Sequence, residues 1–172
     1  MRMLRCVGAC LLLLLAATLP NLALADPPAG VVELRQASVE LTIAGETAFA
    51  DVQLPYGWDT HHKGVTGLGR FVLNFDGPGT FDTPWALYFH RLGNAYQIRL
   101  NGVVIDANGS LQAASALAST QDASPPATDH NSDYAKIPRF VRIPVGVLMR
   151  HNRLEITVRA ESGRRSGVPA VW

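Results

Sequence analysis

Hydrophobic residues recur at every second position along much of this 172-residue chain. The alternating sets are Val39, Leu41 and Ile43; Phe71, Leu73 and Phe75; Leu87 and Phe89; Tyr96, Ile98 and Leu100; Val141 and Ile143; and Leu154, Ile156 and Val158. Polar residues mostly fill the positions between them. Because successive side chains of a β-strand point to opposite faces, this pattern predicts antiparallel strands with one buried face and one solvated face.

Proline and glycine separate these segments at intervals that are typical of a β-sandwich. No long helical pattern lies between them, which argues against the crossover helices of a parallel sheet. Asn101 and Gly102 lie between two short alternating runs, and Asn-Gly favours the positive φ angles of a tight hairpin turn. Residues 145–150 are compatible with one helical turn. We therefore predict an all-β fold, an antiparallel β-sandwich.

The first 25 residues have the features of a cleaved signal peptide. Arg2 and Arg5 precede an apolar run at residues 11–17, and Ala23 and Ala25 supply the small residues before Asp26. The run is shorter than the roughly 20 residues that a membrane-spanning helix needs. We predict cleavage before Asp26, export to the periplasm, and one domain at residues 26–172.

Composition excludes several classes of function for the exported chain. Cys6 and Cys10 both lie in the predicted signal peptide, so residues 26–172 contain no disulfide, thiol nucleophile, cysteine zinc site or iron–sulfur cluster. Without Arg2 and Arg5, 13 basic side chains face 14 acidic ones. A nucleic-acid partner requires many Lys and Arg contacts to phosphate, and this balance does not supply them.

Residues 107–136 are predicted to form an insertion within the sandwich. The stretch 111–121 is rich in alanine but lacks an apolar stripe, and 122–133 has the Ser, Pro, Asp and Asn composition of a mobile loop. Asp129 and His130 lie in that loop with Asp133, without a scaffold to hold catalytic groups in place. We therefore predict no catalytic site.

Histidines give little support for a metal centre. His61 and His62 are adjacent, near Asp59, and adjacent residues rarely aim their side chains at one ion. We predict no metal site and no cofactor, and interpret these histidines as part of a solvated loop.

Aromatic and arginine residues are the better candidates for ligand binding. Aromatic faces at Tyr56, Trp58, Trp85 and Tyr134 suit a sugar ring, although packing in the core is the alternative for Trp58 and Trp85. Arginine forks recognise carboxylates bidentately, so an acidic ligand is a second possibility. The candidate ligand-binding residues are Trp58, Arg91, Asn94, Asp129, His130, Tyr134, Arg139, Arg164 and Arg165.

The order of several short motifs resembles a known family. The motifs are Pro55 to Trp58, the strand that ends at Asp76 and Gly77, Leu100-Asn101-Gly102, the segment Asn152 to Val158, and the glycine-rich stretch Gly163 to Gly167. Together, over about residues 31–172, they resemble the galactose-binding-like jelly roll in the sugar-binding domain of β-galactosidase-type hydrolases. They resemble more closely the periplasmic sensor domains of membrane-bound bacterial histidine kinases and diguanylate cyclases.

The resemblance implies a non-catalytic, ligand-sensing domain of a bacterial signalling receptor, at the periplasmic face of the inner membrane. The chain would then be a fragment of a longer receptor, and would meet the membrane only through a continuation that it lacks. Its partner would be a carbohydrate-like or acidic small molecule, bound by loops at one end of the sandwich, or a protein.

Two alternatives remain open. A free-standing secreted carbohydrate-binding module predicts an exposed aromatic platform. A protein-docking domain predicts a sizeable apolar patch without a pocket.

Overall fold

The computed structural model describes residues 30–77, 83–93, 95–112, 137–161 and 166–172. The predicted signal peptide and most of the predicted insertion lie outside these residues. The described elements are β1 (Gln36–Ile43), β2 (Glu46–Gln53), β3 (Tyr56–Gly57), α2 (Trp58–His61), β4 (Gly67–Asp76), β5 (Ala86–Phe89), β6 (Ala95–Leu100), β7 (Val103–Asn108), β8 (Arg139–Arg142), β9 (His151–Ala160) and β10 (Gly167–Val168).

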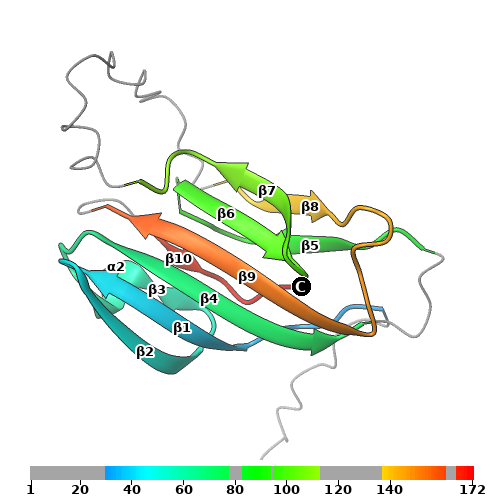
Figure 1. Ribbon diagram of the computed structural model, residues 1–172, viewed down its shortest axis with the longest axis horizontal. Coiled ribbons are helices and arrows are strands. Elements are labelled where there is room, and N and C mark those ends of the chain that lie inside the picture. The colour runs from blue at the N-terminus through cyan, green and yellow to red at the C-terminus, as the bar shows by residue number, and fades with distance from the viewer. Residues whose placement is uncertain (1–29, 78–82, 94, 113–136, 162–165) are drawn as a thin grey trace, which may run out of the picture.

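The strands form two layers. One layer is a six-stranded antiparallel sheet in the order β2-β1-β4-β9-β6-β7, and the other holds the pairs β5–β8 and β3–β10 (Figure 1). The short helix α2 follows β3 at one end of the molecule (Figure 1). This arrangement confirms the predicted all-β, antiparallel sandwich.

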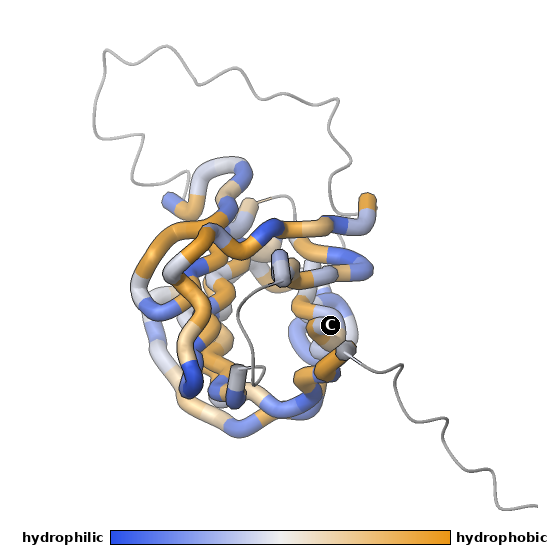
Figure 2. The backbone as a smooth tube through the Cα atoms, turned by 90° about the vertical axis from the view of Figure 1, so that its right-hand side faces the viewer, coloured by the Kyte–Doolittle hydropathy of each residue, from blue (hydrophilic) through white to orange (hydrophobic). Residues whose placement is uncertain are grey.

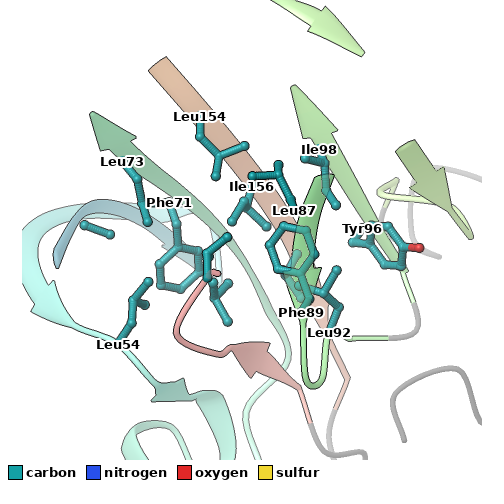
Figure 3. Packing of buried hydrophobic residues seen from close by; sticks show 14 of the residues in the cluster. Leu54, Phe71, Leu73, Leu87, Phe89, Leu92, Tyr96, Ile98, Leu154 and Ile156 are labelled. Carbon is teal, nitrogen blue, oxygen red and sulfur yellow. The ribbon is translucent and has the colours of Figure 1, made fainter. Parts of the chain in front are cut away.

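The alternating hydrophobic residues fill the space between the layers. Phe71, Ile156 and Ile98 are partners across three neighbouring strands and are at most 1% exposed. Leu87 and Phe89 of β5 lie opposite them (Figure 3). Along the tube in Figure 2, hydrophobic and hydrophilic residues alternate accordingly. Each of these strands therefore buries the face that its sequence pattern predicts.

The outer face of the large sheet carries a group of ion pairs. Arg70 of β4 donates to Glu155 of β9 at 2.7 Å and to Glu40 of β1 at 3.4 Å. Glu155 also accepts a hydrogen bond from Arg153 at 2.8 Å. The two arginines are 42% and 53% exposed and Glu155 is 17% exposed, so each pair lies at the surface and contributes modestly to stability.

The hairpin prediction is confirmed and one local prediction is wrong. Asn101 and Gly102 have φ angles of 52° and 84°, as a tight turn between β6 and β7 requires. Residues 145–147 form a turn instead of the helical turn that the sequence suggested. Gly146 has a φ of 81°, which a helix does not allow.

The last residues of the chain complete the second layer. Val171 exchanges both backbone hydrogen bonds with Leu34, at 2.8 and 3.2 Å. Trp172 does the same with Tyr88 of β5, at 2.8 and 3.2 Å. The second layer thus continues from β8 through β5 to residues 171–172 and then to Leu34.

Candidate functional site

A groove of about 700 Å³ opens where β4 ends and β5 begins. This is the end of the sandwich that faces the viewer in Figure 2. We call it the aromatic groove, and its wall includes Val31, Val32, Trp85, Tyr88, Phe140, Arg142 and Trp172. Most of the lining is apolar, and a few polar groups lie among the apolar ones, as in many small-molecule sites.

Strand pairing places three aromatic residues in one row of this groove. Tyr88 of β5 is the register partner of Phe140 of β8, and it exchanges both backbone hydrogen bonds with Trp172. Directly paired residues of antiparallel strands carry their side chains on the same face. Their neighbours Leu87, Val141 and Val171 are buried, so Trp172, Tyr88 and Phe140 form a row on the outer face.

The two outer residues of the aromatic row are open to solvent, and Tyr88 between them is half-buried. Phe140 is 72% exposed and Trp172 is 37% exposed. Neither side chain contributes to the buried core, so the sandwich does not require aromatic residues at these positions. Flat apolar faces kept at a groove are suited to stacking against a ring-shaped ligand.

Polar groups lie beside the row. Arg142 pairs with Ala86 on the same strands, is exposed, and has no ion-pair partner among the described residues. Asp76 contributes a carboxylate whose Oδ1 lies 2.6 Å from Nδ1 of His151. The indole N–H of Trp85 is buried and meets no acceptor within the described part of the chain. The groove therefore combines stacking surfaces with donors and an acceptor.

Trp58 does not belong to this groove. It is 2% exposed, and its indole N–H donates to the carbonyl of Val65 at 2.9 Å. Its ring also packs over Gly67, where an added Cβ would lie 2.6 Å from the indole. A ring enclosed in this way has no free face for a sugar, which agrees with the alternative of core packing.

Arg91 and Arg139 lie toward the other end of β5 and β8. Arg91 lines a smaller hollow of about 540 Å³, with Asp59, His90 and Ser166. Arg139 pairs with Phe89, and its guanidinium lies 5.8 Å from the centre of the Tyr96 ring. Neither arginine reaches the aromatic groove.

Six of the predicted ligand-binding residues lie outside the described residues. They are Asn94, Asp129, His130, Tyr134, Arg164 and Arg165. Their roles stay predictions.

The two adjacent histidines pack against aromatic rings. His61 stacks on Tyr56 with ring centres 4.4 Å apart, and Nε2 of His62 lies 2.7 Å from the Tyr56 hydroxyl. Burial raises the pKa of Tyr56. Asp59 instead accepts a hydrogen bond from the backbone N–H of Ser166 at 3.1 Å. The described residues contain no group of three or more His, Cys, Asp or Glu that could hold a metal ion.

Sequence reasoning missed the aromatic row. The alternation shows that Tyr88, Phe140 and Arg142 face away from the core, but it does not show which strands are neighbours. Only the pairing of β5 with β8 and with residues 171–172 brings the row together.

Among the described residues, the structure has no helix with the length and hydrophobicity that crossing a membrane requires.

Comparisons with known proteins support the fold. No family model and no curated protein matches the sequence. Among solved structures, the chain is similar to a GH2 beta-galacturonidase from Eisenbergiella tayi bound to galacturonate, with a TM-score of 0.50 and 14% identity. The match covers 81% of this chain but 23% of that enzyme, so the chain spans about a quarter of its length. At this identity the likeness concerns the fold, and it supports the galactose-binding-like β-sandwich that the motif order implies.

Proposed function

We propose that this domain is a non-catalytic binding domain that holds a carbohydrate in the aromatic groove. The row of Trp172, Tyr88 and Phe140 is the observation that carries the proposal. A pyranose ring has apolar C–H faces that stack on such side chains, and Arg142 and Asp76 lie where they can bond its hydroxyl or carboxyl groups. The free-standing module considered above predicted such a platform.

The finer proposal is that binding serves the sensory end of a periplasmic bacterial receptor. Its support is the motif order over residues 31–172, which resembles the sensor domains of histidine kinases and diguanylate cyclases. In such a receptor, a ligand on the row would touch Trp172 directly and so would bias the position of whatever adjoins it. A free-standing carbohydrate-binding module remains the alternative.

A thermal-shift screen of residues 26–172 against neutral sugars, sugar acids and organic acids tests the proposal. A sugar at 100 times its dissociation constant should add about 2.7 kcal/mol to the free energy of unfolding. The double variant Tyr88→Ala and Phe140→Ala should lose this shift. Phe49→Ala, which removes an aromatic side chain that is 77% exposed on β2, is the matched control and should keep it.

Other outcomes distinguish the alternatives. If the shift survives the double variant and disappears in Arg91→Gln, the ligand binds in the smaller hollow and the groove proposal is wrong. If no compound of any class shifts the unfolding temperature, the result favours the protein-docking alternative. An Arg142→Gln variant that loses sugar acids but keeps neutral sugars would identify Arg142 as the partner of the carboxylate.

A further inference from the structure

The connection between β8 and β9 presents two apolar side chains to solvent. Val145 is 105% exposed and Met149 is 52% exposed. Val147 and Leu148, which lie between them, pack against the core. Val147 and Leu148 therefore supply the core contacts of this connection, whereas Val145 and Met149 face solvent.

This connection is held rigidly. The N–H of Val147 bonds the carbonyl of Pro144 at 3.2 Å, and Gly146 has the positive φ that the third position of a type II turn requires. Asn101 donates to the carbonyl of Val147 at 2.7 Å. The exposed side chains thus project from a fixed backbone, so little conformational entropy is lost when they bind.

Two arginines flank the exposed pair. Arg142 precedes the turn and Arg150 follows it, and both are exposed. Neither has an ion-pair partner within the described segments. The nearby carboxylate of Asp76 is already 2.6 Å from His151. We call Val145, Met149, Arg142 and Arg150 the apolar tip.

The geometry points to the surface of a bilayer that contains anionic phospholipid as the partner of the apolar tip. Apolar side chains enter the boundary between headgroups and acyl chains, while cations attract anionic headgroups, and the tip offers both together. A stable protein interface buries about 800 Å² on each partner, which a projecting turn with two apolar side chains does not offer. The contact shares Arg142 with the aromatic groove, but its apolar residues Val145 and Met149 lie outside the groove lining, so membrane binding does not require a sugar.

Vesicle co-sedimentation of residues 26–172, a segment that includes every described residue, tests this inference. Vesicles of phosphatidylcholine with phosphatidylglycerol should bind the domain, and vesicles of phosphatidylcholine alone should bind it about tenfold less. Val145→Asp with Met149→Asp should weaken binding to the anionic vesicles about tenfold or more. Arg142→Gln with Arg150→Gln should reduce the preference for anionic lipid.

The matched control is Phe49→Asp, which places a charge on a residue of the edge strand β2 that is 77% exposed. It should bind vesicles like the parent, and all variants should keep the parent's unfolding temperature. Failure of the parent to bind any vesicle, or equal binding by the Val145→Asp and Met149→Asp variant, would overturn the inference. The inference would also be wrong if the parent self-associates without binding vesicles and the Val145→Asp and Met149→Asp variant does not self-associate. The tip would then bind a second copy of the chain. Tyr88→Ala leaves the apolar tip intact. If this variant loses sugar binding but still binds anionic vesicles, the two proposals are tested separately.

Discussion

Asn101 donates its side-chain amide to the side-chain oxygen of Asn152 at 2.9 Å, and so joins the β6–β7 turn to the start of β9. Asn152 is 4% exposed, and its amide also bonds both backbone groups of Met149, at 2.8 and 2.7 Å. Asn101 accepts a further hydrogen bond from the N–H of Arg153 at 2.9 Å. Asn101 and Asn152 belong to two of the motifs in the family resemblance. Together they hold the connection between β8 and β9, which carries the apolar tip.

Asn152→Ala should lower the free energy of unfolding by about 2–3 kcal/mol, because it removes the hydrogen bonds that a buried amide makes with Asn101 and with both backbone groups of Met149. Urea titration measures the change. Asn74→Ala, at an exposed position of β4, is the control and should change stability by about 0.5 kcal/mol or less. Equal stability of the Asn152→Ala protein and the parent would show that the amide cluster is dispensable.

Gly77→Ala should destabilise the domain by about 1–3 kcal/mol, because the added Cβ would lie 2.1 Å from the carbonyl oxygen of Met149. The same carbonyl accepts from Asn152, so the substitution should also loosen the connection. Faster amide hydrogen exchange at residues 147–150 would report that loosening. Unchanged exchange with lower stability would restrict the effect to Gly77 itself.

Trp58→Phe should cost about 1–2 kcal/mol, since it removes the hydrogen bond to Val65 and part of a buried ring. If the groove binds a sugar as proposed, the substitution should leave its dissociation constant unchanged, because Trp58 lies outside the aromatic groove. Chemical denaturation and a binding titration on the same sample separate the two effects. A weaker affinity for the sugar at unchanged stability would show that Trp58 belongs to the ligand site.

The stability of the domain should fall in acid partly through Glu155. Hydrogen bonds from Arg153 and then Arg70 hold the pKa of Glu155 below its ordinary value of 4.5. Above pH 4.5 the carboxylate is ionised in both states and its contribution is complete. As the pH falls through this value, the unfolded chain takes up the proton first, and the contribution is lost as the pH reaches the folded pKa.

Glu155→Gln should therefore show a smaller loss of stability between neutral and acidic pH than the parent. Unfolding free energies measured across that range test the difference. Glu46→Gln, on the exposed strand β2, is the matched control and should follow the parent's curve. If both variants follow it, the ion pairs on the outer face do not contribute to acid sensitivity.

Sequence periodicity predicted the strands that bury one face, because alternation reports burial directly. It missed β2, in which seven of eight residues are exposed, since a strand without a buried face leaves no apolar signal. It also missed β3 and β10, which are two residues each and exist through their pairing with one another. The Asn101–Gly102 turn was predictable because its chemistry is local.

The candidate site was less accessible to sequence reasoning than the fold. The sequence made Trp58 a candidate ligand-binding residue, because it is an aromatic residue after a turn. Its contacts with Val65 and Gly67 show that the fold encloses it. Tyr88, Phe140 and Trp172 are separated by 52 and 32 positions in the sequence and become neighbours through strand pairing. A row of this kind depends on long-range topology, which alternation does not encode.

The hydrogen bonds of Val171 with Leu34 join the two extremes of the described chain. During synthesis from the amino end, Leu34 and Tyr88 have to wait for Val171 and Trp172 before these pairs of the second layer can form. Loss of those two residues would also remove one third of the aromatic row and leave the backbone groups of Leu34 and Tyr88 without partners. Pairing of the second layer with residues 171–172 and assembly of the aromatic row are thus the same event.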